Sequence, residues 1–280
     1  SLLENSKNFK ATTDLQEGLN HSDIIFIIVP TPNRGGDRFY DHSILSNLLL
    51  KINKHKIKNK SLIIGCTVMP GYIRDIAKFL IKDCENTTIN YNPEFIAQGE
   101  IVKGFRNPDI ILIGTNDATL GDKLKEIYKN IACTDPKYCI LKPIEAEMVK
   151  ISINGFITTK LSFANMISDA CDRLGADKNV VLKSVGGDSR IGNKYFNPGY
   201  SFGGPCFPRD TKALKQVIDS VNINSDLLGA TTKYNEEHSL FQTNQLLKEG
   251  TETYVIEDIC YKEGSKIPII EESAKLKIAK

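Results

Sequence analysis

The chain has 280 residues, of which 41% are hydrophobic and 25% are charged. At roughly 150 residues per domain, this length predicts about two domains, each with a core of its own. The 36 basic and 34 acidic side chains nearly cancel, which argues against the basic surface of a nucleic-acid-binding protein. No stretch approaches the ~18 apolar residues of a membrane span. The composition therefore predicts a soluble globular protein.

The seven cysteines are scattered, odd in number and free of any C-x-x-C pair. This usage argues against a disulfide framework or zinc site and favours a reducing, cytoplasmic location. The histidines share no ligand-like spacing, so we predict no metal site and expect each at the surface or in a loop. They are His21, His42, His55 and His238.

The first 140 residues alternate β-rich runs with amphipathic stretches. The run 24–29 predicts a strand buried on both faces, as in a parallel sheet. Further strands are predicted at 62–64, 87–91 and 110–113, and helices at 43–56, 71–83 and 118–131. This alternation predicts βαβ units in an α/β fold.

Three of these strands are followed by loops rich in Pro, Gly and polar residues. The loops are Val29-Pro30-Thr31-Pro32, Cys66 to Gly71, and Asn92-Pro93-Glu94-Phe95. Parallel sheets bind ligands at the carboxyl ends of their strands. We therefore expect the three loops to share one crevice.

The pattern changes at residue 144. Apolar residues at helical intervals predict one helix over 144–174, about 45 Å long, which suits a connection between domains or a subunit interface. Helices are also predicted at 210–220 and 225–248, a strand at 254–261 and the start of a helix at 271–280.

The segment 186–210 holds six of the 20 glycines in 25 residues, which is typical of backbone that approaches a ligand. Within it, Cys206 lies between a glycine pair and a predicted helix start, where a thiol can be activated, although most loop cysteines are inert. Lys150 and Asn154 share a face of the long helix. The alternative for this pair is an ordinary solvated surface.

Together these motifs carry a resemblance to a known family. They are Val29 to Pro32, Cys66 to Gly71, Asn92 to Phe95, Asn107-Pro108-Asp109, Glu145-Ala146 with Lys150 and Asn154, Arg190-Ile191-Gly192, and Gly203-Gly204-Pro205-Cys206-Phe207-Pro208-Arg209-Asp210. In order and spacing the chain resembles the UDP-glucose/GDP-mannose dehydrogenase family. The resemblance implies NAD-dependent oxidation of UDP-glucose to UDP-glucuronate through two hydride transfers.

The resemblance also implies catalytic roles. Cys206 would bind the substrate carbon as thiohemiacetal and thioester, and Lys150 with Asn154 would stabilise developing oxyanions. Asp210 and Thr67 would position a water that accepts protons. The resemblance further implies that Glu94 would act as the base in thioester hydrolysis.

Binding roles follow from the same resemblance. The NAD crevice would be lined by Pro30, Thr31, Cys66, Thr67 and Gln98. The nucleotide sugar would contact Phe95, Lys150, Asn154, Arg190, Tyr195, Phe196, Asn197, Phe202, Gly203, Tyr261 and Lys262. Because Arg190 matches an arginine that reaches the neighbouring subunit's substrate, the resemblance implies a homodimer built on the long helix, without nucleic-acid or membrane partners.

The implied architecture is α/β in three parts. Residues 1–141 would form part of a Rossmann-like parallel-sheet domain that binds NAD. Residues 142–250 would form a central helical domain for dimerisation and substrate binding. Residues 251–280 would open a second Rossmann-like domain for the UDP group.

The chain departs from the family pattern at three points. It contains no G-x-G-x-x-G, it has Gln98 where many members have a glutamate, and its third domain stops after one β-α unit. We therefore expect a fragment or a shortened paralogue. Three alternatives stay open: a different nucleotide sugar (GDP-mannose or UDP-N-acetylmannosamine), NADP in place of NAD, and a non-catalytic nucleotide-sugar-binding scaffold.

Overall fold

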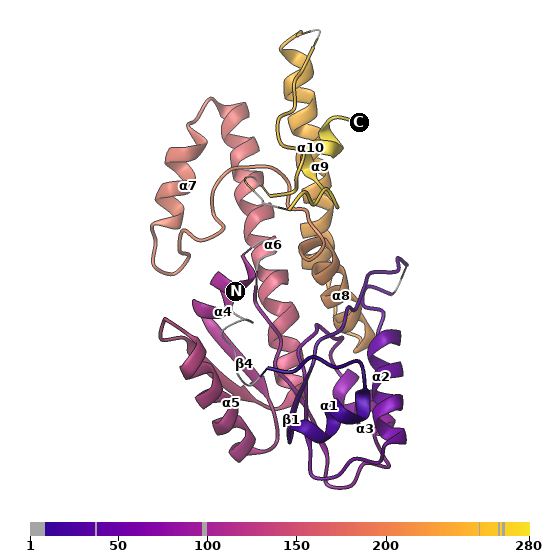
Figure 1. Ribbon diagram of the computed structural model, residues 1–280. Helices are drawn as coiled ribbons and strands as arrows, with labels where there is room; N and C mark the ends of the chain where they lie inside the picture. Colours follow the sequence, from indigo (N-terminus) through magenta and orange to yellow (C-terminus); the bar gives the residue numbers. More distant parts are fainter. Residues whose placement is uncertain (1–8, 37, 97–99, 252, 263, 265–266) are drawn as a thin grey trace. The chain divides into compact units, whose positions relative to one another are not determined.

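A computed structural model describes the chain except for residues 1–8, 37, 97–99, 252, 263 and 265–266 (Figure 1). The chain folds as two compact units. The sheet unit comprises Ser1–Pro32, Asp41–Phe95 and Val102–Glu147, and the helical unit comprises Asn33–Tyr40, Ile96–Ile101 and Met148–Lys280.

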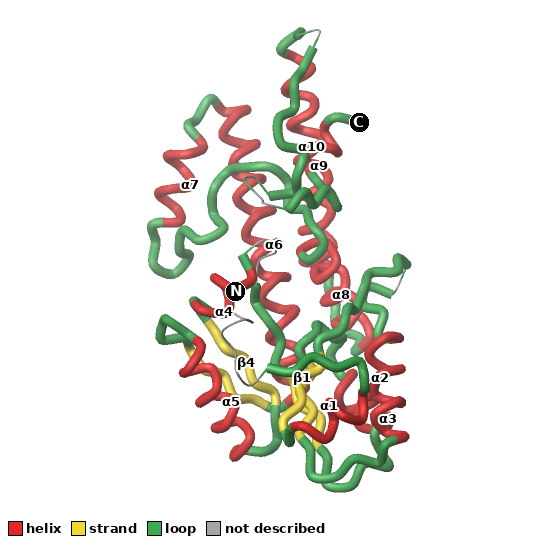
Figure 2. Tube along the Cα trace, viewed as in Figure 1, coloured by secondary structure: helices red, strands yellow, loops and turns green. Residues whose placement is uncertain are grey.

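The sheet unit is built on a five-stranded sheet in the order β1-β2-β3-β4-β5 (Figure 2). Its strands are β1 (Ile24–Ile27), β2 (Ser61–Ile64), β3 (Thr88–Tyr91), β4 (Ile110–Gly114) and β5 (Lys137–Leu141). β1, β2 and β3 are mutually parallel, and so are β4 and β5. The predicted α/β fold with parallel strands is thus confirmed.

One junction of the sheet differs from a uniformly parallel arrangement. β3 meets β4 antiparallel, through the single pair Tyr91–Gly114. A Cβ atom on Gly114 would lie 2.9 Å from the Cβ of Ala146 and 3.1 Å from that of Tyr91. The glycine is therefore needed for the two halves of the sheet to meet.

The sequence reading was wrong about the two outer strands of the described sheet, β1 and β5. β1 ends at Ile27, and Phe26 within it is 41% exposed, so the strand is not buried on both faces. β5 was not predicted, although Tyr138 to Leu141 form a short apolar run, and its residues are half-buried or exposed rather than buried.

The helices of the sheet unit are α1 (Leu15–His21), α2 (Ser43–Lys54), the π-helix η1 (Tyr72–Ala77), α3 (Lys78–Leu80), most of α4 (Ile101–Arg106), and α5 (Ala118–Ile131). The three predicted helices are present, whereas α1 and α4 were missed because each is only one to two turns long. α5 begins where the Asp117 carboxylate accepts the amide of Leu120. Its Leu120 and Leu124 pack on Ile63, Ile111 and Ile113 of the sheet.

The helical unit is organised around α6 (Pro143–Leu174), which confirms the predicted long helix and has its first residues in the sheet unit. The other helices are α7 (Lys178–Gly186), α8 (Phe207–Ser220), α9 (Asp226–Lys248) and α10 (Ala274–Ile278). Figure 1 shows α7 on one side of α6 and α8 with α9 on the other. One core cluster joins Ile151, Leu214 and Leu228, and another joins Ala164, Leu182 and Phe196.

Two predictions for the helical unit are wrong. The described residues of the predicted strand 254–261 pair with no other strand and contain no regular element, and Val255 is 84% exposed. His238 is buried rather than superficial: its Nδ1 lies 2.8 Å from an oxygen of Asp169 and its Nε2 lies 2.8 Å from the carbonyl oxygen of Gly199. Its carboxylate partner lies 69 positions away in the sequence, beyond the reach of any local pattern.

Among the described residues, no helix combines the length and the hydropathy that a membrane span requires.

Candidate functional site

Cys206 is the N-cap residue of α8. Its carbonyl oxygen accepts the amide of Asp210 at 2.8 Å, which forms the first turn of the helix. Pro208 favours a helix start at this point, since its fixed φ suits a first turn in which no amide partner is needed. The helix therefore holds the thiol at its positive end.

The Cys206 thiol lies in an electrostatically mixed setting. The residue is exposed, yet the atoms packed around its sulfur make desolvation the main cause that raises its pKa. The Asp210 carboxylate raises this pKa further, while Arg209 and Lys150 lower it. The thiol thus stays protonated at rest, with two cations close enough to favour the thiolate when the proton leaves.

Lys150, Asn154 and Asp210 are brought together beside this thiol. The Asn154 amide nitrogen donates to Asp210 Oδ2 at 2.6 Å. Lys150 lies one turn earlier on α6, and only 8% of it is exposed. Asp210 is 2% exposed. Fixed donors and a cation next to a nucleophile can stabilise an oxyanion that forms on an attacked carbonyl group.

Tyr40 and Arg209 also contact Asp210. The sequence reading did not identify Tyr40, and it quoted Arg209 in a motif without giving it a role. The Tyr40 hydroxyl donates to Asp210 Oδ1, and Arg209 Nε lies 3.4 Å from the same oxygen. Tyr40 lies 170 positions before Asp210, so no local pattern signals this contact.

Two of the glycines in the segment 186–210 pack against the chain's own C-terminal residues. A Cβ atom on Gly203 would lie 2.0 Å from the carbonyl oxygen of Glu272. One on Gly204, whose φ is +79°, would lie 2.5 Å from the Tyr261 ring. At these two positions the glycines allow close packing within the chain.

The residues predicted to hold the nucleotide end differ in exposure. Tyr195 is half exposed and Asn197 is exposed, whereas the rings of Phe196 and Phe202 are buried in the helical unit. Phe196 packs in the core cluster with Ala164 and Leu182.

The remaining predicted substrate residues lie at the surface or partly buried. The Arg190 side chain is exposed and pairs with Asp188 at 2.7 Å. Lys262 pairs with Glu100 at 3.7 Å. Burial raises the pKa of Tyr261, and the nearby Cys206 raises it further, which places the Tyr261 phenol close to the thiol.

The sheet unit positions the three polar loops at one edge. They follow β1, β2 and β3, which are parallel neighbours in register. The Thr31 hydroxyl donates to the carbonyl oxygen of Thr67 at 2.9 Å and ties the first two loops together. Burial raises the pKa of Cys66 to about 11, and the carboxylate of Glu94 raises it further.

The residues predicted to line the NAD crevice differ in exposure. Pro30 is exposed, Thr31 is buried, and Cys66 and Thr67 are half-buried. The loops lie at the carboxyl edge of the parallel strands, where a parallel sheet binds its ligands. Phe95 is also half-buried on this unit, and Gln98 lies outside the described residues. The G-x-G-x-x-G turn, which holds a pyrophosphate, does not occur in the 280 residues.

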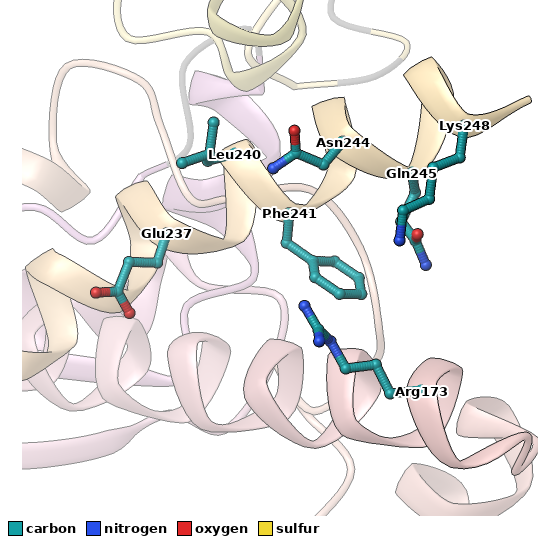
Figure 3. A pocket seen from close by; sticks show the side chains of 7 residues that line it. All are labelled: Arg173, Glu237, Leu240, Phe241, Asn244, Gln245 and Lys248. Carbon is teal, nitrogen blue, oxygen red and sulfur yellow. The ribbon is translucent and has the colours of Figure 1, made fainter. Parts of the chain in front are cut away.

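A separate hollow lies between α6 and α9 of the helical unit (Figure 3). Arg173 reaches from α6 toward the Phe241 ring on α9, with its guanidinium carbon 5.4 Å from the ring centre. None of the residues around Cys206 lines this hollow. The contacts of Cys206 and Asp210 described above place the candidate site at Cys206 instead.

Comparison with known proteins agrees with this reading of the fold. Residues 2–132 match the NAD binding domain of the UDP-glucose/GDP-mannose dehydrogenase family, and residues 144–237 match the central domain of the same family. A solved UDP-glucose dehydrogenase from Pyrobaculum islandicum superimposes with a TM-score of 0.82 at 28% identity, over 96% of this chain and 63% of that one.

Curated relatives of this chain are also named as UDP-glucose dehydrogenases. The UDP-glucose 6-dehydrogenase of Rickettsia bellii is 32% identical over 240 residues, which are 86% of this chain and 55% of that protein. The UDP-glucose 6-dehydrogenase YwqF of Bacillus subtilis is 32% identical over 84% of this chain and 53% of its own length. The chain thus spans about half the length of the curated relatives it matches.

Proposed function

Since this chain belongs to the UDP-glucose/GDP-mannose dehydrogenase family, we propose that its protein oxidises the 6-hydroxyl of a nucleotide sugar, UDP-glucose, to a carboxylate with NAD. One observation carries the proposal. Cys206 lies at the N-terminus of α8, with Lys150 near its thiol. Asp210 lies in the first turn of the same helix, where the amide of Asn154 fixes its carboxylate. A thiol, an ammonium group and an ordered carboxylate suit covalent catalysis on an aldehyde.

The oxidation proceeds in balanced steps. NAD, when bound, would supply a hydride acceptor for each of two oxidations of the sugar carbon. The first oxidation removes a hydride and the hydroxyl proton, which passes to a water, and leaves an aldehyde. Cys206 adds through sulfur to the aldehyde carbon, its proton ends on oxygen, and a thiohemiacetal forms. Loss of the second hydride, and of the hydroxyl proton to a water, leaves a thioester. Water then cleaves the carbon–sulfur bond and yields the acid and the free thiol.

The helical unit's residues stabilise charge during these steps. Lys150 donates to the oxygen that becomes anionic, and Asn154 has a second amide hydrogen for the same purpose. Asp210 accepts the remaining amide hydrogen of Asn154 and so fixes its orientation. The roles of Thr67 and Glu94, on the sheet unit, are proposed from the family resemblance alone.

Two further parts of the proposal concern ligands and partners. Tyr195, Asn197 and Lys262 offer exposed or half-buried side chains for the nucleotide end. We also propose that α6 joins two copies of the chain, with Arg190 directed to the partner's site. An exposed stripe on α6 supports this pairing, and its residues are Phe156, Phe163, Met166, Ala170 and Leu174.

The substrate is tested with a panel of nucleotide sugars on the longest open reading frame that contains this sequence. We expect two NADH per UDP-glucose. Faster turnover of GDP-mannose or UDP-N-acetylmannosamine would keep the reaction and replace the sugar. Binding of a nucleotide sugar without NAD reduction by any of them would favour the non-catalytic scaffold.

The covalent step is tested by Cys206→Ser. Because a hydroxyl is a much weaker nucleophile than a thiolate, turnover to the acid is expected to fall by roughly 10³-fold or more, measured as NADH formed per enzyme. Cys133→Ser, at another exposed cysteine, is the matched control and should behave as wild type. Full turnover in Cys206→Ser would exclude the thioester route.

A further inference from the structure

The Asp210 carboxylate has donors on both oxygens. Oδ2 accepts the Asn154 amide at 2.6 Å. Oδ1 accepts the Tyr40 hydroxyl, and Arg209 Nε approaches the same oxygen at 3.4 Å. Since Asp210 is 2% exposed, protein groups rather than water set its position.

The two groups on Oδ1 also contact each other. The Arg209 guanidinium carbon lies 4.3 Å from the centre of the Tyr40 ring, in cation–π geometry. Tyr40 is 4% exposed and ends the segment Asn33–Tyr40 of the helical unit. The ring therefore orients the guanidinium, and hydroxyl and guanidinium converge on one carboxylate oxygen.

We propose that Tyr40 and Arg209 form a clamp that fixes the Asp210 carboxylate beside Cys206, and that Tyr40 is thereby a positioning residue for the reaction at this thiol. The inference rests on the proposed function for its catalytic consequence. The clamp itself rests only on contacts within the helical unit.

The clamp has an electrostatic consequence for the thiol. The Asp210 carboxylate raises the pKa of Cys206 and Arg209 lowers it. A hydrogen bond from Tyr40 offsets part of the carboxylate charge. Removing that hydroxyl should therefore raise the pKa of Cys206 further and reduce the thiolate fraction at neutral pH.

The test is Tyr40→Phe, which keeps the ring beneath Arg209 and removes only the hydroxyl. Tyr234→Phe is the matched control, because the Tyr234 hydroxyl likewise donates to a carboxylate, that of Asp169, at 2.7 Å in the same unit. The readout is the rate of iodoacetamide alkylation of Cys206 against pH. It is followed by mass spectrometry on the tryptic peptide 195–209, which contains one cysteine.

We expect Tyr40→Phe to slow alkylation at pH 7.5 about 3- to 10-fold, which is up to one unit of thiol pKa, and to shift the profile to higher pH. Tyr234→Phe should match wild type. In turnover, Tyr40→Phe should lower kcat by roughly 10-fold with little change in KM, as for a group that acts at the reacting centre. An alkylation profile of Tyr40→Phe equal to wild type would overturn the clamp.

A second variant keeps the test decisive if Tyr40→Phe is unstable. Arg209→Lys retains the charge and the tryptic site but loses the planar stacking group, so it should also shift the alkylation profile to higher pH. No shift in a folded Arg209→Lys would count against the clamp. Alkylation needs neither sugar nor cofactor, so a shifted profile in a protein that oxidises no nucleotide sugar would keep the clamp and reject the proposed function.

Discussion

At the scale of single residues, His42 shows how burial sets the chemistry of a side chain. Its Nε2 accepts the amide of Met69 at 3.2 Å, and its ring stacks on Tyr72 with centres 4.3 Å apart. Burial lowers the pKa of His42 to about 4, while the neighbouring Asp41 acts in the opposite direction. The neutral imidazole is thus the form that the fold binds.

A pH dependence of stability follows from this histidine. Between about pH 6.5 and 4 the unfolded chain binds a proton that the folded chain does not, so its contribution to stability is lost as the pH falls through this range. The loss is about 2–3 kcal/mol. His42→Gln keeps an acceptor without a titration, so urea unfolding at pH 7 and pH 4.5 should show a smaller acid destabilisation than wild type. Equal acid destabilisation in the two proteins would contradict the assignment.

Glu147 is a second residue whose burial serves a structural role, the capping of η1. It is fully buried, and its two oxygens accept the amides of Gly71 and Ile73 at 2.7 and 3.0 Å, at the start of η1. Desolvation raises the pKa of this carboxyl group, although the two amides oppose the rise. A carboxylate from the start of α6 thus supplies the cap that Gly71, which has no side chain, does not provide.

At the scale of elements, the start of α8 is held by the C-terminal segment. The amide of Gly204 donates to the carbonyl oxygen of Glu271 at 3.1 Å, and the Tyr261 ring covers the same glycine. The C-terminal segment therefore contacts the loop that carries Cys206 through irregular backbone rather than through a β-strand. The packing depends on the missing side chains of Gly203 and Gly204.

Gly203→Ala tests this packing. A Cβ atom there would overlap the carbonyl oxygen of Glu272, so the segment 251–280 should detach at a cost of about 1–2 kcal/mol. Its proteolytic cleavage should accelerate roughly 5- to 30-fold, since cleavage follows the population of the open form. Gly199→Ala, in the same loop with open space around it, should be cleaved like wild type. Unchanged cleavage in Gly203→Ala would show that the segment is not held by this contact.

At the scale of the whole molecule, the chain divides into a sheet unit and a helical unit, each with its own core. The helical unit leaves a line of apolar side chains on α6 in solvent. These residues, Phe156, Phe163, Met166, Ala170 and Leu174, follow one another at intervals of seven, three, four and four, which keeps them on one helix face. Contiguous exposed apolar surface of this kind is typical of an interface.

Phe156→Asp tests the proposed pairing of two copies. Phe156 is 66% exposed, so a charge there should leave the fold intact and cost the interface several kcal/mol through desolvation. Sedimentation equilibrium should show the mass of one chain in place of two. Phe79→Asp, at a phenylalanine that is 67% exposed on the sheet unit, should leave the mass unchanged. A dimeric Phe156→Asp protein would place the interface elsewhere.

The sequence by itself determined the elements with strong periodicity. The sequence predicts the apolar strands, the 32-residue α6 and the order of the motifs, because each depends on residues that are close together in the chain. Pairing across the sheet was harder to predict, because the antiparallel pairing of Tyr91 with Gly114 depends on the space next to a glycine. The strand predicted at 254–261 is absent, because a strand forms only where an adjacent strand accepts and donates its backbone hydrogen bonds.

Only the tertiary structure decided which side chains surround the reactive ones. Cys206 and Asp210 are visible in a motif, but Tyr40 reaches Asp210 across 170 positions, and His238 reaches Asp169 across 69. Such contacts leave no trace in local composition, because folding, and not the chain's local order, brings the partners together. The motif thus indicates the proposed chemistry, while burial and long-range hydrogen bonds determine the charge states of the side chains around Cys206.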